Sequence, residues 1–214
     1  MILLIEEGGI LTMFISFEGV DGSGKSTQIR LFAAYLEENN IPYIMLREPG
    51  STKIGEKIRD LLLDPENSEM QPETEAVLYA AARVQLIKEV IMPALGEGKV
   101  VICDRYLDSS IAYQAYGREL GLEEVLRIND YAVKNCLPDI TIFLDVPPKT
   151  AGSRMEGRTL DRLELEGIAF KERVYKGFHE AAKHFPERIR VINASGTKEE
   201  TQAMIRNAIR EKGL

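Results

Sequence analysis

A phosphate-binding loop is the clearest chemical signal in this sequence. Gly19, Gly24, Lys25 and Ser26 fit the pattern G-x-x-x-x-G-K-[ST], with an apolar strand pattern before it and a helical pattern after it. The glycines let backbone N–H groups approach an anion, Lys25 reaches the β- and γ-phosphates of a nucleotide, and Ser26 binds Mg²⁺. The alternative is a glycine-rich turn with no ligand. The predicted phosphate site comprises Gly19, Val20, Asp21, Gly22, Ser23, Gly24, Lys25, Ser26 and Thr27.

A second acidic position is expected beside this loop. Residues 99–104 read as an apolar strand that ends in Asp104, a pattern in which the carboxylate works with Mg²⁺. Arg105 follows directly and places a cation beside the metal. Alone this pattern is weak, but after a phosphate-binding loop it is the expected partner. We therefore predict a Mg²⁺ site at Ser26 and Asp104.

Two pairs of side chains on predicted helices have the spacing needed to hold a flat ring. Tyr79 and Arg83 are four residues apart in an alanine-rich helix, and Ser110 and Gln114 repeat this spacing in a later helix. The first pair can stack on a ring and hydrogen-bond to it, and the second can read the polar edge of a base. The alternative for the first pair is a core tyrosine and a surface ion pair.

Two further cationic segments are candidates for binding anions. Arg47 begins a loop at the carboxyl end of a predicted strand, where open α/β sheets bind ligands; the alternative is an ordinary loop arginine. Residues 151–163 contain Arg154, Arg158 and Arg162 at intervals of four. We interpret this segment as a lid over phosphates. The alternative is a solvated helix face.

The elements that must position these residues alternate along the chain. Strands are predicted near residues 13–17, 43–46, 99–104, 139–146 and 188–192, and helices at 27–39, 54–63, 72–92, 108–116, 122–134, 163–183 and after 197. This order predicts a three-layer α/β fold with about five parallel strands and helices on both faces. Asp108 or Ser109 is expected to cap the fourth helix, and Thr197 with Glu200 to form a capping box for the last.

Composition narrows the possible classes of protein. The 214 residues predict a single domain, 1–214, and a net charge of −7 argues against a nucleic-acid partner. Two cysteines do not suggest a disulfide framework. The sequence lacks an apolar run of membrane-spanning length and a signal-peptide pattern, so we expect a soluble, cytoplasmic protein with no membrane partner.

Residues 1–12 precede the first predicted strand. Glu6, Glu7 and Gly8 can be encoded by purine-rich bases that resemble a ribosome-binding site, which favours Met13 as the natural start. The alternative is an N-terminal extension whose apolar residues 2–5 add a strand at a sheet edge. The N-terminal mass of the protein from its native host would distinguish the two.

Four segments together resemble the thymidylate kinase family of P-loop nucleoside monophosphate kinases. They are FEGVDGSGKST at 17–27, REPGST at 47–52, TEAVLYAAARVQL at 74–86 and DRYLDSSIAYQ at 104–114. The resemblance implies a P-loop NTPase fold and transfer of the ATP γ-phosphoryl group to dTMP with Mg²⁺, for dTTP synthesis, by a homodimer. Alternatives are a kinase for another pyrimidine nucleotide such as dUMP, a nucleoside kinase, or a non-kinase P-loop NTPase. No N-K-x-D motif supports a GTPase.

The resemblance also implies roles for residues of the acceptor site. Arg47 and Arg105 fall where the dTMP phosphate is held, and Asp21 falls near the acceptor sugar and the metal. Tyr79 falls where an aromatic ring stacks on thymine, and Arg83 falls where a thymine carbonyl is read.

Three more positions complete the acceptor site that the resemblance implies. Ser110 and Gln114 fall at the N3 edge of thymine. Tyr113 falls beside the deoxyribose, where an aromatic ring disfavours a 2′-hydroxyl. The same likeness implies a cis peptide between Glu48 and Pro49.

The catalytic residues implied by the resemblance depend on whether the phosphate loop contains an arginine. Some family members carry an arginine inside this loop, but this chain has Gly22 and Ser23 there. The transition-state cation must then come from Arg154 or Arg158, although one of the two can instead stack on adenine. The catalytic set is Lys25, Arg105, Arg154, Arg158 and Asp21.

Overall fold

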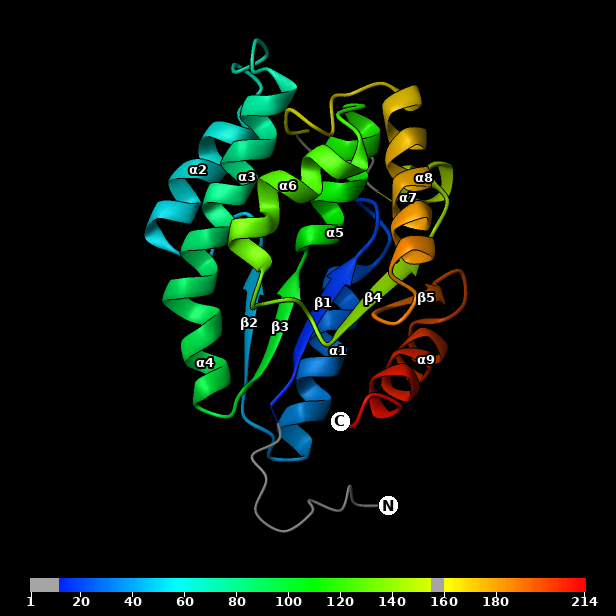
Figure 1. Cartoon of the computed structure of the whole chain (residues 1–214). Coiled ribbons are helices and arrows are strands. Elements are labelled where there is room, and N and C mark those ends of the chain that lie inside the picture. Colours follow the sequence, from blue (N-terminus) through cyan, green and yellow to red (C-terminus); the bar gives the residue numbers. More distant parts are fainter. Residues whose placement is uncertain (1–11, 155–159) are drawn as a thin grey trace.

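The structure, a computed structural model that describes residues 12–154 and 160–214, is built around a five-stranded parallel sheet (Figure 1). Its strands, in the spatial order β2-β3-β1-β4-β5, are β1 (Phe14–Glu18), β2 (Tyr43–Arg47), β3 (Val100–Asp104), β4 (Ile140–Asp145) and β5 (Ile189–Asn193). The three central strands are almost wholly buried and apolar, as expected for a parallel sheet covered on both faces. The predicted α/β sheet is confirmed.

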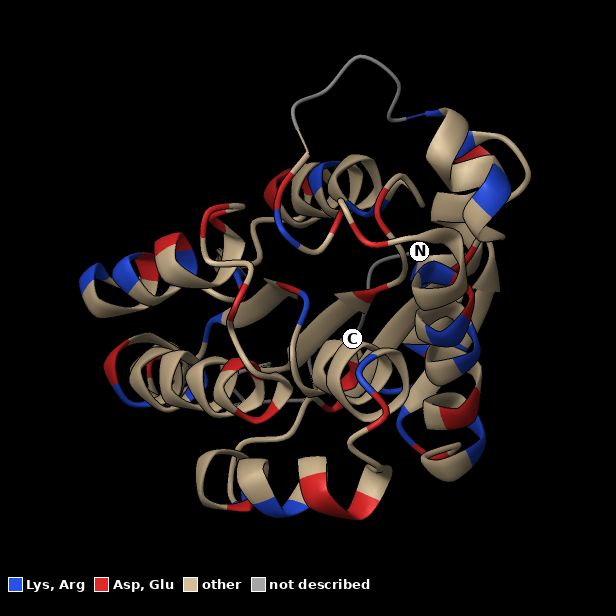
Figure 2. Cartoon of the chain, turned by 90° about the horizontal axis from the view of Figure 1, so that it is seen from above, with Lys and Arg blue, Asp and Glu red and all other residues tan. Residues whose placement is uncertain are grey.

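Helices cover both faces of this sheet. They are α1 (Lys25–Glu38), α2 (Lys53–Leu63), α3 (Pro72–Leu86), η1 (Ile87–Ile91), α4 (Met92–Gly96), α5 (Leu107–Ser110), η2 (Ile111–Gly117), α6 (Leu122–Val133), α7 (Pro148–Ser153), α8 (Ile168–His184) and α9 (Lys198–Arg210). In Figure 1, α1 lies behind the strands and contacts α9, whereas α3, α6 and α8 lie in front. Figure 2 views the molecule from above, along the strands, and shows positively and negatively charged residues interspersed around the sheet. None of the described helices combines the length and the apolar character needed to cross a membrane.

The parallel register brings the predicted functional segments to one edge of the sheet. Phe17 pairs with Asp104 across β1 and β3, and Arg47 pairs with the same Asp104 across β2 and β3. The strand order reverses at β1, since β3 lies on one side of it and β4 on the other. Ligands of open α/β sheets bind at the carboxyl edge beside such a switch point.

The helix predicted at residues 72–92 is continuous but not uniformly α-helical. It begins as α3, widens into the π-helical turn η1 and ends as α4. Pro93 lies at the start of α4 and has no N–H to donate, so the regular i→i−4 ladder cannot pass through it. A π-helical turn before this proline keeps the chain helical while the ladder is interrupted.

The helix predicted at residues 108–116 differs in its cap. It begins at Leu107 with Tyr106 as the N-cap and no side-chain cap, so the expected cap by Asp108 or Ser109 was wrong. Both side chains are buried in other contacts: Asp108 pairs with Arg188, and the Ser109 hydroxyl donates to a buried glutamate. Polar groups that are taken up by tertiary contacts are no longer available to cap a helix.

The remaining predictions about elements have mixed outcomes. The capping box of Thr197 and Glu200 at the start of α9 is confirmed. The helix expected from Leu163 instead begins at Ile168. Residues 1–11, on which the two hypotheses about the N-terminus depend, lie outside the described residues.

Candidate active site

The phosphate loop connects β1 to α1 and requires glycine at defined positions. Gly19, Gly22 and Gly24 have φ angles of 140°, 81° and 99°, in a region that side chains rarely adopt. A Cβ on Gly19 would lie 2.8 Å from the Leu144 carbonyl oxygen and 2.9 Å from Ser23 Oγ. The loop therefore has the backbone conformation and the position at a helix N-terminus that suit phosphate binding.

Lys25 is the first residue of α1 and is turned back over the loop. Its Nζ donates to the carbonyl oxygens of Gly19 (2.9 Å) and Val20 (3.1 Å). Burial, and then the nearby charge of Arg105, lower the pKa of Lys25 to about 8. A buried ammonium group beside another cation favours binding of an anion, which restores the charge balance.

A cavity of about 890 Å³ extends over this loop. It is lined by every loop residue from Asp21 to Thr27 and by Asp104, Arg105, Arg154 and the start of α9. Gly19 and Val20, which were also predicted to bind the nucleotide, do not line this cavity, but their carbonyl oxygens accept hydrogen bonds from Lys25. Seven of the nine residues predicted for the nucleotide therefore line one cavity.

The proposed metal pair fits Mg²⁺ when phosphates complete its coordination. Ser26 and Asp104 line the same cavity, and Asp104 Oδ1 is buried with no hydrogen-bond partner among the described residues. The described part of the chain has no cluster of three or more metal-ligating His, Cys, Asp or Glu side chains. Mg²⁺ is commonly held by one or two protein oxygens together with substrate phosphates and water, which matches this sparse site.

Arg105 lies at the junction of two cavities. It has a φ of +69°, which is unusual for a residue with a side chain. Its guanidinium donates from Nη1 to the Gly19 carbonyl (3.0 Å) and to Ser109 Oγ (3.1 Å), and from Nη2 to Asp21 Oδ1 (2.5 Å). The loop and the segment after β3 thus hold this cation between the phosphate loop and the second cavity.

Asp21 is fixed by the same contacts. Tyr113 donates its hydroxyl to Asp21 Oδ2 (3.1 Å), and the Arg105 guanidinium lies 5.2 Å from the centre of the Tyr113 ring. Burial alone would raise the pKa of Asp21, but Arg105 and Lys25 hold it well below its usual range. Asp21 is therefore ionised at neutral pH and can accept a hydrogen bond from a hydroxyl or from metal-bound water.

The second cavity has a volume of about 150 Å³ and adjoins the first. Its lining includes five of the residues predicted for acceptor binding: Tyr79, Arg83, Ser110, Tyr113 and Gln114. It also shares Asp21 and Arg105 with the cavity over the phosphate loop. The helices α3, α5 and η2 therefore bring together side chains that are up to 35 positions apart in the sequence.

Arg83 lies at the base of this second cavity and is almost completely buried. Its Nε and Nη2 donate to Glu48 Oε2 at 2.8 and 2.5 Å, and Nη2 also donates to Ser110 Oγ at 3.1 Å. The alternative of a surface ion pair is thus wrong, because both partners are buried. Glu48 is joined to Pro49 by a cis peptide bond, which confirms that expectation.

Arg47 is placed differently from the other acceptor-site candidates. Its side chain is 49% exposed, pairs with Glu56 at 2.8 Å and lines the cavity over the phosphate loop but not the second, smaller cavity. Sequence reasoning missed Arg59, which lines both cavities and donates to the Pro49 carbonyl at 2.9 Å. Burial, and then the charge of Arg47, lower the pKa of Arg59. The sequence signal that could have identified Arg59 is its spacing of seven residues from Thr52, the N-cap of α2, which places both residues on the same face of that helix.

The arginines predicted for a lid have three different outcomes. Arg154 is exposed, lines the larger cavity and donates to the Gly22 carbonyl at 3.2 Å. Arg158 lies outside the described residues. Arg162 was expected in the same cationic row, but it is buried and donates to Glu75 at 2.6 Å. It is therefore a structural partner of α3 and not a cation over the phosphates.

Glu18, the last residue of β1, lies beneath the site and is fully buried. It accepts hydrogen bonds from the Tyr106 N–H (2.7 Å) and from Ser109 Oγ (2.6 Å). Burial, reinforced by the nearby charge of Asp108, raises the pKa of Glu18 to about 8. The carboxyl group thus links the strand under the phosphate loop to the segment that carries Arg105.

This raised pKa predicts a pH dependence of stability. Between its ordinary value of 4.5 and about 8, Glu18 binds more protons in the folded chain than in the unfolded chain. Its contribution to the free energy of unfolding is therefore complete below pH 4.5 and is lost as the pH rises through 8. In Glu18→Gln the side chain stays neutral, so we expect a smaller loss of stability between about pH 5 and 8, measured by urea unfolding. Glu123→Gln, an exposed position, is the control, and equal pH slopes in all three proteins would contradict the prediction.

The fold and the two joined cavities define a class of protein. A phosphate loop with a buried lysine adjoins a small cavity lined by aromatic and hydrogen-bonding side chains, and a fixed arginine lies between them. This arrangement belongs to a P-loop kinase that acts on nucleotides.

Comparison with known proteins names the family. The family model described as thymidylate kinase matches residues 17–205, and the chain belongs to this family. It is 50% identical to a thymidylate kinase of Lactobacillus acidophilus, over 85% of this chain and 86% of that one. It is 47% identical to one of Symbiobacterium thermophilum over 94% of each chain. A crystal structure of thymidylate kinase from Ehrlichia chaffeensis superposes with a TM-score of 0.76 at 33% identity, covering 94% of this chain and 99% of that chain.

Proposed function

We propose that the chain transfers the γ-phosphoryl group of ATP to dTMP, giving ADP and dTDP for the synthesis of dTTP. The observation that carries this proposal is the position of Arg105, which binds the phosphate loop on one side and lines the base-sized cavity on the other. A cation at this junction can hold an acceptor phosphate next to the terminal phosphate of ATP. The reaction needs positioning and charge neutralisation more than covalent chemistry.

The donor half of the site is the phosphate loop. Its backbone N–H groups and Lys25 bind the β- and γ-phosphates of ATP. Ser26 and Asp104 would hold Mg²⁺, which supplies neutralising charge when it is bound to the phosphates. Asp104 Oδ1, which has no hydrogen-bond partner among the described residues, would then interact with the metal ion directly or through water.

The acceptor half of the site binds dTMP. Arg105, Arg47 and Arg59 hold the phosphate, and Tyr79 stacks on the base. Its buried neighbour Arg83 reads a base carbonyl. The phosphate of dTMP is already ionised at neutral pH, so the attacking oxygen needs no protein base.

The remaining acceptor contacts concern the sugar and the choice of base. Tyr113, held by Asp21, lies where it disfavours a 2′-hydroxyl on the deoxyribose. Ser110 and Gln114 face a pyrimidine edge. A methyl group contributes only ~1–3 kcal/mol to discrimination in a pocket, so dUMP is the nearest alternative acceptor.

The transition-state cation is assigned to the segment 151–163, proposed to act as a lid. Arg154 already donates to the Gly22 carbonyl of the phosphate loop, which supports it as one candidate. Arg158 is the second candidate, and one of the two contacts adenine instead. Closure of this segment would also exclude water and suppress hydrolysis of ATP.

A panel of acceptors tests the proposed reaction. ADP release from Mg·ATP is measured with dTMP, dUMP, dCMP, thymidine or no acceptor. We expect the highest kcat/KM with dTMP, and little release with thymidine, which lacks the attacking phosphate. Equal ADP release with and without acceptors would instead indicate an NTPase, and a preference for thymidine would indicate a nucleoside kinase.

The stacking role of Tyr79 gives a prediction about affinity. Replacement of Tyr79 by alanine is expected to raise the Kd for dTMP by about 10- to 100-fold, because stacking on an aromatic ring contributes roughly 1–3 kcal/mol per base. Tyr79→Phe keeps the ring and serves as the matched control, with affinity close to that of the unaltered chain. Isothermal titration with dTMP measures both. An unchanged Kd in the alanine variant would argue against stacking.

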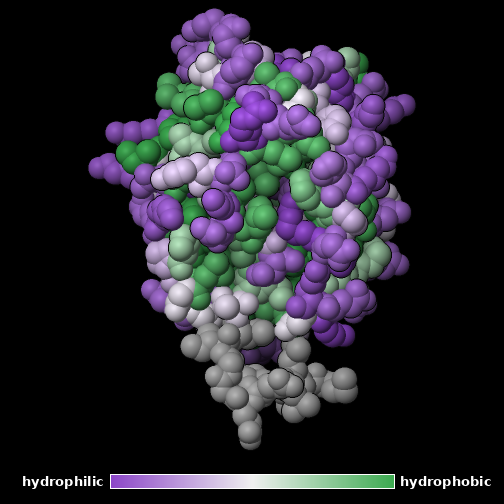
Figure 3. Space-filling model, viewed as in Figure 1, coloured by the Kyte–Doolittle hydropathy of each residue, from purple (hydrophilic) through white to green (hydrophobic). Residues whose placement is uncertain are grey.

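We also propose that the protein is a cytoplasmic homodimer. Large apolar side chains are exposed on neighbouring helices of one face, with exposed fractions of 51% for Leu61, 54% for Val77 and 82% for Tyr131. Figure 3 shows hydrophobic residues gathered down the middle of the side of the molecule seen in Figure 1. A surface of this kind supports self-association. The mass in solution, by sedimentation equilibrium, tests the proposal.

A further inference from the structure

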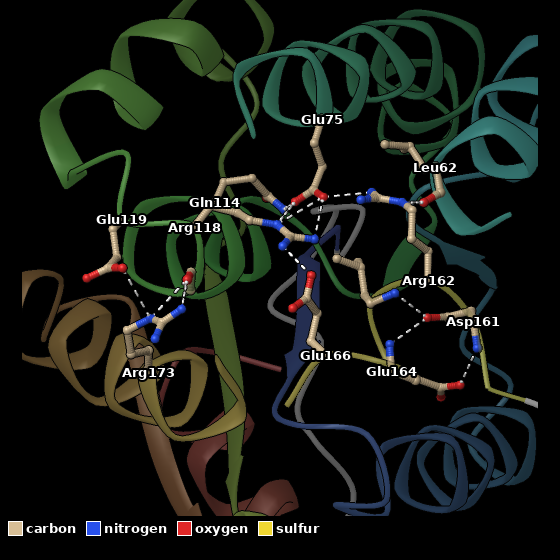
Figure 4. A network of polar contacts seen from close by, with 12 residues as sticks. Leu62, Glu75, Gln114, Arg118, Glu119, Asp161, Arg162, Glu164, Glu166 and Arg173 are labelled. Atoms are coloured by element: carbon tan, nitrogen blue, oxygen red, sulfur yellow. Dashed lines mark hydrogen bonds and ion pairs between the residues drawn. The ribbon is translucent and has the colours of Figure 1, made fainter. Parts of the chain in front are cut away.

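Glu75 of α3 is a buried carboxylate behind the base cavity that phosphoryl transfer does not use directly (Figure 4). Its Oε1 accepts a hydrogen bond from Gln114 Nε2 at 2.8 Å. Its Oε2 accepts from Arg118 Nη2 at 3.0 Å and from Arg162 Nη2 at 2.6 Å. Three segments that are distant in the sequence therefore meet at one side chain.

The two guanidinium groups fix Glu75 in position. Arg162 is itself held because its Nε donates to the Leu62 carbonyl at 2.8 Å and its backbone N–H donates to the Leu63 carbonyl at 3.0 Å. Arg118 also pairs with Glu166 on its far side. Arg118 Nε donates to both carboxylate oxygens of Glu75, and Arg162 donates to Oε2, so both oxygens are held as hydrogen-bond acceptors.

This constraint decides which way the Gln114 amide faces. A glutamine amide can turn to present either its NH₂ group or its oxygen, but Glu75 Oε1 can be matched only by the NH₂ group. Gln114 lines the base cavity, and no described residue donates a hydrogen bond to its Oε1. The group that Gln114 can offer to a ligand is therefore the carbonyl oxygen.

We propose that Glu75 is a positioning residue that sets base specificity by holding Gln114 with its carbonyl oxygen toward the base. An acceptor at this place selects a pyrimidine whose N3 carries a hydrogen, which is true of thymine and uracil. In cytosine N3 is itself an acceptor, so it would oppose the Gln114 oxygen and leave both unsatisfied. This inference rests on the proposed function, because it assigns the cavity to a pyrimidine base.

The test is the ratio of kcat/KM for dTMP to kcat/KM for dCMP. In Glu75→Gln the new amide can donate as well as accept, so Gln114 is free to turn, and the ratio is expected to fall by about 10- to 100-fold. Arg118→Gln is the matched control: it weakens the same cluster but leaves Glu75 paired with Arg162 and bonded to Gln114. Its ratio is expected to change by less than about threefold.

The outcomes separate this inference from the proposed function. If the unaltered chain does not phosphorylate dTMP, the proposed function is wrong. If it does, and Glu75→Gln keeps the original ratio, only the role of Glu75 is wrong. Equal falls in the ratio in both variants would indicate a general structural role and would also overturn the inference.

Loss of the buried charge can prevent Glu75→Gln from folding, so a second measurement uses the unaltered chain. Neutron diffraction from its complex with dTMP locates the deuterons of the Gln114 amide. The inference predicts both deuterons on the side of the amide that faces Glu75. Amide deuterons directed at the base would overturn it, whatever the variant does.

Discussion

Replacement of Lys25 by alanine is expected to lower kcat by about 10³-fold, the loss typical of removing a charged group that stabilises phosphoryl transfer. Among the described residues, its Nζ donates hydrogen bonds only to the carbonyl oxygens of Gly19 and Val20, so a bound γ-phosphate would be its charged hydrogen-bond partner. The fold should persist, because burial disfavours the Lys25 ammonium and lowers its pKa to about 8. Alanine removes this buried charge and leaves the glycine-dependent loop turns unchanged.

Steady-state kinetics and thermal unfolding together test this expectation. Lys53→Ala is a suitable control, because Lys53 is exposed at the start of α2 and lines neither cavity. We expect Lys53→Ala to retain kcat within about twofold and both variants to unfold cooperatively. ADP production near the normal rate in Lys25→Ala would contradict the assignment of the phosphate loop.

The second large effect is expected at Arg105. Alanine at this position should reduce kcat/KM for dTMP by about 10³-fold, since the acceptor phosphate loses the cation that holds it in line. The same substitution should weaken ATP binding far less, because the phosphate loop keeps Lys25 and its backbone N–H donors. Removal of Arg105 also takes away the main favourable partner of Asp21, whose pKa should move back toward its usual range.

A conservative change separates charge from geometry at this position. Arg105 uses two nitrogens to reach three acceptors on two segments: Gly19, Asp21 and Ser109. Lysine keeps the charge but cannot reproduce this fork, so Arg105→Lys should retain only an intermediate kcat/KM. Equal values for the lysine variant and the unaltered chain would show that charge alone is sufficient. A normal kcat/KM for dTMP in Arg105→Ala would show that Arg105 does not hold the acceptor phosphate, and would contradict the argument for the proposed function.

The parts of the fold that depend on local pattern could be predicted from the sequence. Short apolar runs indicated all five strands, and the three central strands are buried on both faces, as is typical of a parallel sheet. The loop from Gly19 to Ser26 could be predicted because its φ angles demand glycine at fixed positions. Tyr79 with Arg83, and Ser110 with Gln114, could be paired because helix geometry alone puts residues four apart on one face.

Other features depend on contacts between distant segments and could not be read from local pattern. Asp108 has a composition suited to a helix cap, but pairing with Arg188 takes it into the core. In the sequence Arg162 continues a regular spacing of arginines, but in the structure it is buried in an ion pair with Glu75. Arg59 reaches the acceptor cavity only because α2 packs against α3. Helical spacing predicts which residues share a helix face. It does not predict which charged residue of a distant segment will pack against that face.

The central claim is that phosphate passes from ATP to dTMP and not to water. The most direct test incubates the chain with Mg²⁺, dTMP and ATP labelled at the γ-phosphorus, and separates the labelled products. We predict that the label appears in dTDP in a one-to-one ratio with ADP, and that little label is released as inorganic phosphate. Label found mainly in inorganic phosphate, at a rate that does not depend on dTMP, would contradict the account.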